Sequence, residues 1–141
     1  MICTFFGHSD TPLEAEPLLR KTLIWLIQEK DVKLFYVGNH GNFDKMVRKN
    51  LKELTFLYPH IRYAVVLAYL PSTSDCEDFS DTIYPDGMEH IPFKYAIIKR
   101  NEWMIEKSDY VITYVKRTRG GAARFKQIAE RKNKYVINIA K

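Results

Sequence analysis

The sequence predicts one α/β domain of three layers, in which a mostly parallel sheet of about five strands lies between two layers of helices. Short apolar runs of β type alternate with longer segments of helical periodicity along residues 1–141. This alternation is typical of parallel sheets that are covered on both faces. A length of 141 residues suits a single domain, and the sequence contains no internal repeat or linker. We therefore expect a single Rossmann-like sandwich.

The first half of the chain is expected to supply three strands and two helices. Strands are predicted at three apolar runs, residues 1–6, 33–38 and 62–70. Pro12 and Pro17 mark the entrance of the first helix, and the second helix begins near Asn42 or Asp44. Each helix carries one apolar stripe, formed by Leu19, Leu23, Leu26 and Ile27 in the first and by Val47, Leu51 and Leu54 in the second.

A long acidic loop separates these elements from the last third of the chain. Residues 71–92 contain six acids and no Lys or Arg. Loops of that length are uncommon in compact domains and usually have a function, such as that of a lid. The elements predicted beyond the loop are helices at 93–107 and 121–132 and strands at 109–115 and 135–140.

The positive charge of the chain is concentrated in its C-terminal part. The net charge is +5, and from Lys94 to Lys141 there are 13 Lys and Arg against four acids. This segregation favours an anionic partner. Charge alone leaves open the alternative of a solvated basic face that has no partner.

The composition does not indicate a membrane, secreted or metal-binding protein. No stretch approaches the ~20 apolar residues of a membrane span, and residues 1–10 lack the features of a signal peptide. Cys3 and Cys76 suit a reducing cytosol better than a disulfide framework, and the four scattered His give no zinc spacing. We expect a cytoplasmic protein without a membrane span, a metal site or a prosthetic cofactor.

Glycines stand where several predicted strands end. In parallel α/β sheets, ligands bind beyond the carboxyl ends of the strands, where the strand order reverses. The loops expected there include residues 7–10 (GHSD), 38–42 (GNHGN) and 116–121 (KRTRGG). One glycine at such a place indicates only a tight turn. Several glycines along one edge of a sheet predict a nucleotide site.

The 116–121 loop has the composition of a phosphate site. Gly120 and Gly121 would let a ligand approach the backbone, and the free N–H groups at the start of the next helix attract anions. Lys116, Arg117 and Arg119 add positive charge. The spacing is not that of a P-loop, because no Gly-Lys-Ser/Thr follows.

The loop after the first strand supplies candidate contacts to the sugar or base of a nucleotide. Gly7, His8 and Ser9 lie there. His8 is either a ligand contact or a histidine with a structural role. Ser9 lacks the base and the orienting group of a catalytic triad.

The loop after the second strand, and one helix, supply further candidates. Gly38, Asn39 and Gly41 lie in that loop, and Asp44 either caps the following helix or accepts a ribose hydroxyl, with capping preferred. Arg100 interrupts an apolar helical face, so it either ties loops together or reaches the ligand.

Four segments, taken in order, resemble a known superfamily. GHSD (7–10), GNHGNFD (38–44), RNEWMIEKSDYVITYV (100–115) and RGGAARFKQIA (119–129) are similar to the YpsA-like branch of the SLOG superfamily. That superfamily also contains the LOG cytokinin-activating phosphoribohydrolases and the DNA-processing protein DprA. The resemblance implies a Rossmannoid fold that binds nucleotides or nucleotide-derived ligands. By family analogy it also implies a homo-oligomer.

The sequence departs from the superfamily patterns at two places. The YpsA-like Gly-His-Arg pattern appears as GHS at 7–9, so an arginine for phosphate is missing. LOG enzymes carry Pro-Gly-Gly-x-Gly-Thr-x-x-Glu, whose glutamate serves in N-glycosidic cleavage. Here the glycines at 120–121 match, whereas Ala123, Arg124 and Gln127 replace the third glycine, the threonine and the glutamate. A neutral amide cannot act as a general base, so the resemblance implies binding without catalytic residues.

Three functions are consistent with these features. The leading hypothesis is a cytosolic sensor or sequestering protein for a nucleotide or nucleotide-derived signalling ligand. The second is a nucleotide N-glycosidase or phosphoribohydrolase with a relocated carboxylate, at Asp44, Asp86 or Glu89. The third is single-stranded nucleic-acid binding, suggested by the basic C-terminal part and the DprA resemblance, although no helix-turn-helix or RNP motif is present.

Overall fold

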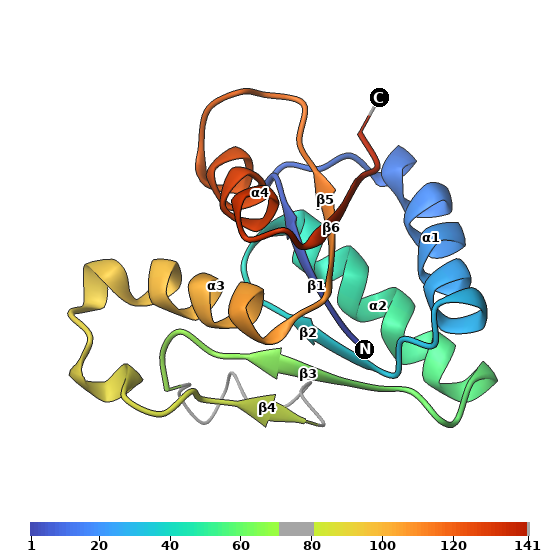
Figure 1. Ribbon diagram of the computed structural model, residues 1–141, viewed down its shortest axis with the longest axis horizontal. Helices are drawn as coiled ribbons and strands as arrows, with labels where there is room; N and C mark the ends of the chain where they lie inside the picture. The colour runs from blue at the N-terminus through green and yellow to red at the C-terminus, as the bar shows by residue number, and fades with distance from the viewer. Residues whose placement is uncertain (71–80, 141) are drawn as a thin grey trace.

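A computed structural model describes residues 1–70 and 81–140 and has the α/β architecture that the sequence predicts (Figure 1). Its strands are β1 (Ile2–Gly7), β2 (Leu34–Val37), β3 (Arg62–Val66), β4 (Thr82–Ile83), β5 (Tyr110–Tyr114) and β6 (Tyr135–Asn138). They form one sheet in the order β4-β3-β2-β1-β5-β6, and every adjacent pair is parallel. The fold class is therefore confirmed, with six strands instead of about five.

The sixth strand, β4, lies in the segment that was expected to be a loop. Its two residues pair with Val65 and Val66, and the amide of Leu67 donates to the carbonyl of Ile83 at 2.8 Å. These bonds satisfy backbone groups at an edge of the sheet that would otherwise lack partners. A run of two residues carries no periodicity from which a strand can be predicted. Of the expected lid, residues 71–80 lie outside the described part of the chain, as does Cys76.

Two helices cover each face of the sheet. They are α1 (Glu16–Glu29) and α2 (Gly41–Leu57) on one face and α3 (Ala96–Lys107) and α4 (Gly121–Arg131) on the other (Figure 1). The α1 and α2 side buries Phe5 and Phe35 together with the predicted leucine stripes. The α3 and α4 side buries Phe6, Met104 and Phe125. Because successive strand residues point to opposite faces, β1 contributes to both cores.

The strand order reverses between β1 and β5. From β1 the chain turns towards α1 on one face, whereas from the adjacent β5 it turns towards α4 on the other (Figure 1). The two connections diverge and leave a crevice beyond the carboxyl ends of these strands. This is the position at which doubly wound sheets bind ligands.

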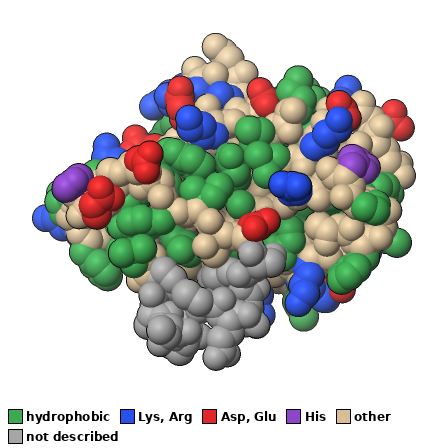
Figure 2. Space-filling model, turned by 90° about the horizontal axis from the view of Figure 1, so that it is seen from below, with side chains coloured by type: hydrophobic (Ala, Val, Ile, Leu, Met, Phe, Trp, Pro, Cys, Tyr) green, Lys and Arg blue, Asp and Glu red, His purple; other side chains and the backbone are tan. Residues whose placement is uncertain are grey.

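The β4 edge of the molecule is seen in Figure 2. Hydrophobic side chains are spread over much of this face, with charged side chains mainly around its margins.

In residues 1–70 and 81–140, no helix has the length and apolar character needed to cross a membrane.

Gly7, the last residue of β1, lies directly against the ring of Phe43. A Cβ atom at position 7 would overlap this ring, which is itself buried at the start of α2. The missing side chain therefore lets the start of α2 approach the end of β1.

We predict that Gly7→Ala lowers the free energy of unfolding by about 1–3 kcal/mol, because the packed Phe43 ring must move. Gly121→Ala is the matched control, since a Cβ atom there meets no atom within 4 Å. The control should change stability by less than about 0.5 kcal/mol. Urea unfolding of both variants measures the difference, and equal stabilities would contradict the assigned packing.

Candidate functional site

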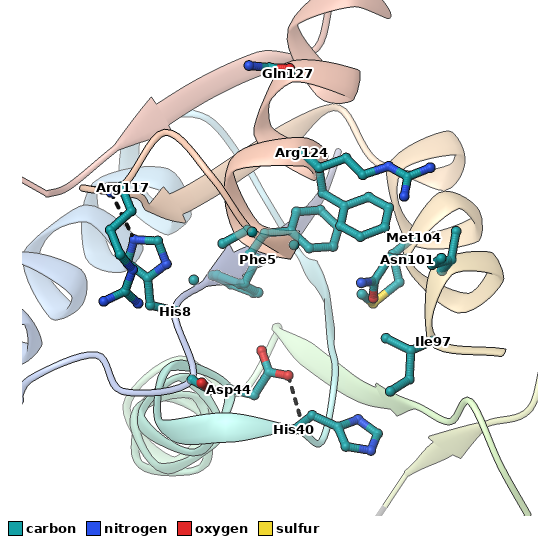
Figure 3. A pocket seen from close by; sticks show the side chains of 18 of the residues that line it. Phe5, His8, His40, Asp44, Ile97, Asn101, Met104, Arg117, Arg124 and Gln127 are labelled. Carbon is teal, nitrogen blue, oxygen red and sulfur yellow. Dashed lines mark hydrogen bonds between the residues drawn. The ribbon is translucent and has the colours of Figure 1, made fainter. Parts of the chain in front are cut away.

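A cavity of about 840 Å³ lies at the crevice between β1 and β5 (Figure 3). One wall is formed by the end of β1 and the loop after it, and another by His40 and Asp44 at the start of α2. The first turns of α3 and the loop and first turns of α4 complete the lining, from 97 to 104 and from 117 to 127. The cavity thus collects loops from both halves of the chain.

The structure brings most of the predicted ligand-binding residues to this cavity. Those that line it are Gly7, His8, Ser9, Asp44, Arg100, Arg119, Gly120 and Gly121. Those that do not are Gly38, Asn39, Gly41 and Lys116.

The residues outside the lining support it from behind. A Cβ atom at Gly38 would lie 2.6 Å from Asp44 Oδ2, and one at Gly41 would lie 2.8 Å from the Cα atom of Ser9. Asn39 accepts a hydrogen bond from Arg100. Lys116 places its ammonium 6.0 Å from the centre of the Tyr114 ring. The glycines at 38 and 41 are therefore explained by close packing of the protein on itself.

The start of α4 has the features of an anion site. Gly120 has φ +102° and ψ 178°, a conformation that in practice only glycine adopts. No side chain caps the helix, and its first turn contains no acid. A Cβ atom at Gly121 would point into open space. The first N–H groups of α4 are thus approachable from the cavity, and such groups attract anions.

The cations around this helix start differ in their partners. Arg117 pairs with Asp10 through two contacts of 2.6 and 3.2 Å. Arg119 and Arg124 line the cavity and have no carboxylate partner within the described part of the chain. In Figure 3, the side chain of Arg124 points towards the side on which α3 lies. Both arginines are exposed and available to an incoming anion.

His8 holds the loop after β5 against the end of β1. Its Nε2 atom accepts hydrogen bonds from the backbone amides of Lys116 at 2.9 Å and Arg117 at 3.4 Å (Figure 3). Burial lowers the pKa of His8, and the Arg117 cation lowers it further. The imidazole is therefore neutral near pH 7 and carries its proton on Nδ1. The structural role is filled by Nε2, which leaves Nδ1–H as the donor for any ligand contact.

Arg100 is a buried cation that ties α3 to the loop after β2 and to the end of β3. Its Nε atom donates to Asn101 Oδ1 at 2.7 Å, and its Nη1 atom donates to the carbonyl of Val66 at 2.9 Å and to Asn39 at 3.2 Å. Its Nη2 atom faces His40 Nδ1 at 3.4 Å. These contacts connect α3 to the ends of β2 and β3. The loop-tying role is thus filled, while Arg100 also lines the cavity.

Asp44 is the carboxylate that lines the cavity among the described residues. Its Oδ2 atom accepts the backbone N–H of His40 at 3.1 Å (Figure 3), so it binds a backbone donor at the helix start, although His40 and not Asp44 is the N-cap residue of α2. Burial raises the pKa of Asp44 to about 6, and the Arg100 cation partly opposes this rise. A carboxyl group with such a pKa can exchange protons near neutral pH.

The other groups considered for catalysis lie elsewhere. Asp86 and Glu89 do not line this cavity, and Glu89 pairs with His90 at 3.4 Å. Gln127 is exposed at the edge of the cavity, and Figure 3 shows it apart from His8 and Asp44. Within the described residues, no three His, Cys, Asp or Glu side chains are grouped so that they would hold a metal ion.

Some features of the site were not predicted from the sequence. His40 and Arg124 line the cavity, and although both lie within quoted segments, neither was chosen as a candidate contact. The Arg117–Asp10 pair joins residues 107 positions apart, so it depends on the strand order. No sequence pattern indicates that the backbone carbonyl of Val66 accepts a hydrogen bond from Arg100.

The Asp44 environment predicts a specific pH dependence of stability. Between about pH 4 and pH 6 the unfolded chain has lost the Asp44 proton while the folded chain retains it, so the free energy of unfolding falls as pH rises. A pKa raised from 3.8 to about 6 corresponds to about 3 kcal/mol. In urea unfolding, the stability of the wild type minus that of Asp44→Asn should fall by about this amount between pH 4 and pH 7. A constant difference would show that the pKa is ordinary.

No protein-family model matches the chain, and no curated protein matches it in sequence. Among solved structures, it is similar to DNA processing protein A from Helicobacter pylori, a structure described for its single-stranded DNA binding mode. The TM-score is 0.67 at 14% sequence identity, over 96% of this chain and 63% of that chain. The chain thus spans less than two thirds of that protein's length. At this identity, what the two proteins share is the Rossmann-like fold.

Proposed function

We propose that the protein binds a nucleotide or a nucleotide-derived ligand, whose phosphate lies on the start of α4, and that it acts as a sensor or sequestering protein. The observation that carries this proposal is the open start of α4 at Gly120-Gly121, beside Arg119 and Arg124, which have no described carboxylate partner. A cavity of about 840 Å³ is in the range that small-molecule ligands occupy.

The rest of the cavity suits the sugar and base of such a ligand. His8 and Asn101 are polar residues at its wall, and Ile97, Met104 and Phe125 are apolar ones. Apolar side chains beside polar groups that can orient a ligand are typical of small-molecule sites. These contacts support placing the phosphate at α4 and the base towards α3.

Binding without cleavage is favoured by the carboxylates. Gln127 cannot replace a catalytic glutamate, and Asp44 already accepts a backbone N–H at the helix start. We therefore interpret the resemblance to the YpsA-like branch of the SLOG superfamily as one of nucleotide binding and not of catalysis. A cytoplasmic homo-oligomer remains part of this proposal by analogy.

Substitution of Gly121 tests the phosphate site. We expect Gly121→Asp to weaken the binding of adenosine 5′-monophosphate and ribose 5-phosphate at least about tenfold in calorimetric titrations, because the new carboxylate repels phosphate. The same carboxylate should stabilise the folded chain slightly, since acids at helix starts are favourable. Loss of binding together with retained stability would separate a site effect from unfolding.

Gly121→Asn, of similar size and without charge, is the matched control and should bind phosphate better than Gly121→Asp. Equal affinity of the wild type and Gly121→Asp would contradict the proposed function. Adenosine 5′-monophosphate should be recovered intact after incubation. Release of free adenine that is lost in Asp44→Asn, with ligand affinity retained, would instead establish the glycosidase alternative.

Single-stranded nucleic-acid binding is the second candidate, because the structural neighbour is described for its single-stranded DNA binding mode. A short oligothymidylate should then bind with a logarithmic salt slope of about −2, since Arg117, Arg119 and Arg124 offer about three contacts. Arg119→Gln should reduce the steepness of this slope by about 0.7. Arg131→Gln, at the far end of α4, is the control and should leave it unchanged. Salt-independent binding would exclude this candidate.

A further inference from the structure

Two stacked aromatic rings, one half-buried and one exposed, lie beside the cavity. Tyr69 follows β3, and Phe93 stands in the short turn before α3. Their ring centroids are 4.3 Å apart with 20° between the planes, and the Tyr69 hydroxyl donates to the carbonyl of Phe93 at 3.2 Å. The side chain of Phe93 is nevertheless 76% exposed. One ring is therefore held in a fixed orientation with most of its surface in solvent.

This pair lies at a second recess, of about 270 Å³, lined mainly by apolar and aromatic side chains. Below the pair, a small core formed by Ala68, Met88 and Ala96 supports Tyr69. Phe93 contributes little to that core. Its ring is a preformed flat surface of the kind on which planar ligands stack.

The recess and the main cavity share a wall. His40 lines the main cavity and contacts Tyr69 edge to face, with ring centroids 6.3 Å apart. The consecutive residues Ala96 and Ile97 line the recess and the cavity, respectively. Arg100 lies next to this wall through its contact with His40. A ligand that extends from the cavity on this side therefore meets aromatic rings.

The distance between the two features indicates the length of the ligand. The start of α4 lies beyond β1 and β5, whereas Tyr69 lies beyond β3, two strands from β1. Neighbouring strands are about 4.8 Å apart, so the two features are separated by on the order of 10–15 Å. A ligand of two nucleotides spans such a separation when its second base lies one nucleotide beyond the bound phosphate.

We propose that Tyr69 and Phe93 form a stacking platform for a nucleobase one nucleotide beyond the phosphate that α4 holds. The proposal rests on the proposed function, because the phosphate at Gly121 sets the position of the chain. It makes the ligand a dinucleotide or a short single strand. Stacking does not depend on the identity of the base, because every base has an aromatic face.

Comparing ligands of one and two nucleotides tests the platform. Adenosine 5′-monophosphate and 5′-phosphorylated diadenylate are titrated into the wild type, Phe93→Leu and Phe93→Trp. Phe93→Leu keeps an apolar side chain but removes the aromatic face, so we expect about tenfold weaker binding of the diadenylate and unchanged binding of the monophosphate. Phe93→Trp, which keeps an aromatic face, should bind the diadenylate as the wild type does. Phe56→Leu, at an equally exposed aromatic residue near the end of α2, is the control and should bind as the wild type does.

A second readout reports stacking directly. A diadenylate analogue carries 2-aminopurine, a fluorescent base, as its second base. Its fluorescence should be quenched when it binds the wild type and much less when it binds Phe93→Leu. Equal diadenylate affinity in the wild type and Phe93→Leu would overturn the platform. If the two affinities are equal but Gly121→Asp abolishes the binding of both ligands, the phosphate site stands and only the platform is wrong. If Gly121→Asp changes neither affinity, the proposed function fails and the platform fails with it.

Discussion

The buried guanidinium of Arg100 is the constraint on which the site depends. A charge removed from water must have its hydrogen bonds met within the protein, or the folded state becomes costly. Arg100 meets them with an amide of its own helix, an amide of the loop after β2 and the last carbonyl of β3. The need to satisfy one side chain therefore ties α3 to two neighbouring connections at the carboxyl edge of the sheet, those after β2 and β3.

The charge of Arg100 is not neutralised by direct contact. In residues 1–70 and 81–140, no carboxylate lies within ion-pair distance of it, and Asp44 acts on it only through space. Burial holds the pKa of Asp44 at about 6, so Asp44 is ionised mainly above that pH. An arriving phosphate would meet Arg119 and Arg124 at α4 while Arg100 acts from the opposite wall. The field of the cavity thus favours anions before any ligand is bound.

The sequence predicts this fold well because its evidence is periodic and local. Apolar runs locate five strands, and proline and glycine locate the starts of α1 and α4, since each feature involves neighbouring residues. Features that depend on the strand order could not be predicted in this way. The pairing of Arg117 with Asp10 and the bond from Arg100 to Val66 require that β1 lie beside β5 and that β3 lie close to α3. The strand β4 forms by pairing with β3 at the edge of the sheet, and a run of two residues gives no sign of such a pairing.

The glycines of the site have different structural reasons, which the sequence does not distinguish. Gly7, Gly38 and Gly41 each face an atom that a Cβ would approach to 2.8 Å or less, so the packing of the protein on itself explains them. Gly120 is explained by its backbone conformation. Gly121 has neither reason, because its φ is ordinary and its missing side chain faces open space beside exposed arginines. Helix propensity alone would favour alanine at such a position. The anion that we propose at the helix start would use this open space, and it is the occupant that the surrounding charge favours.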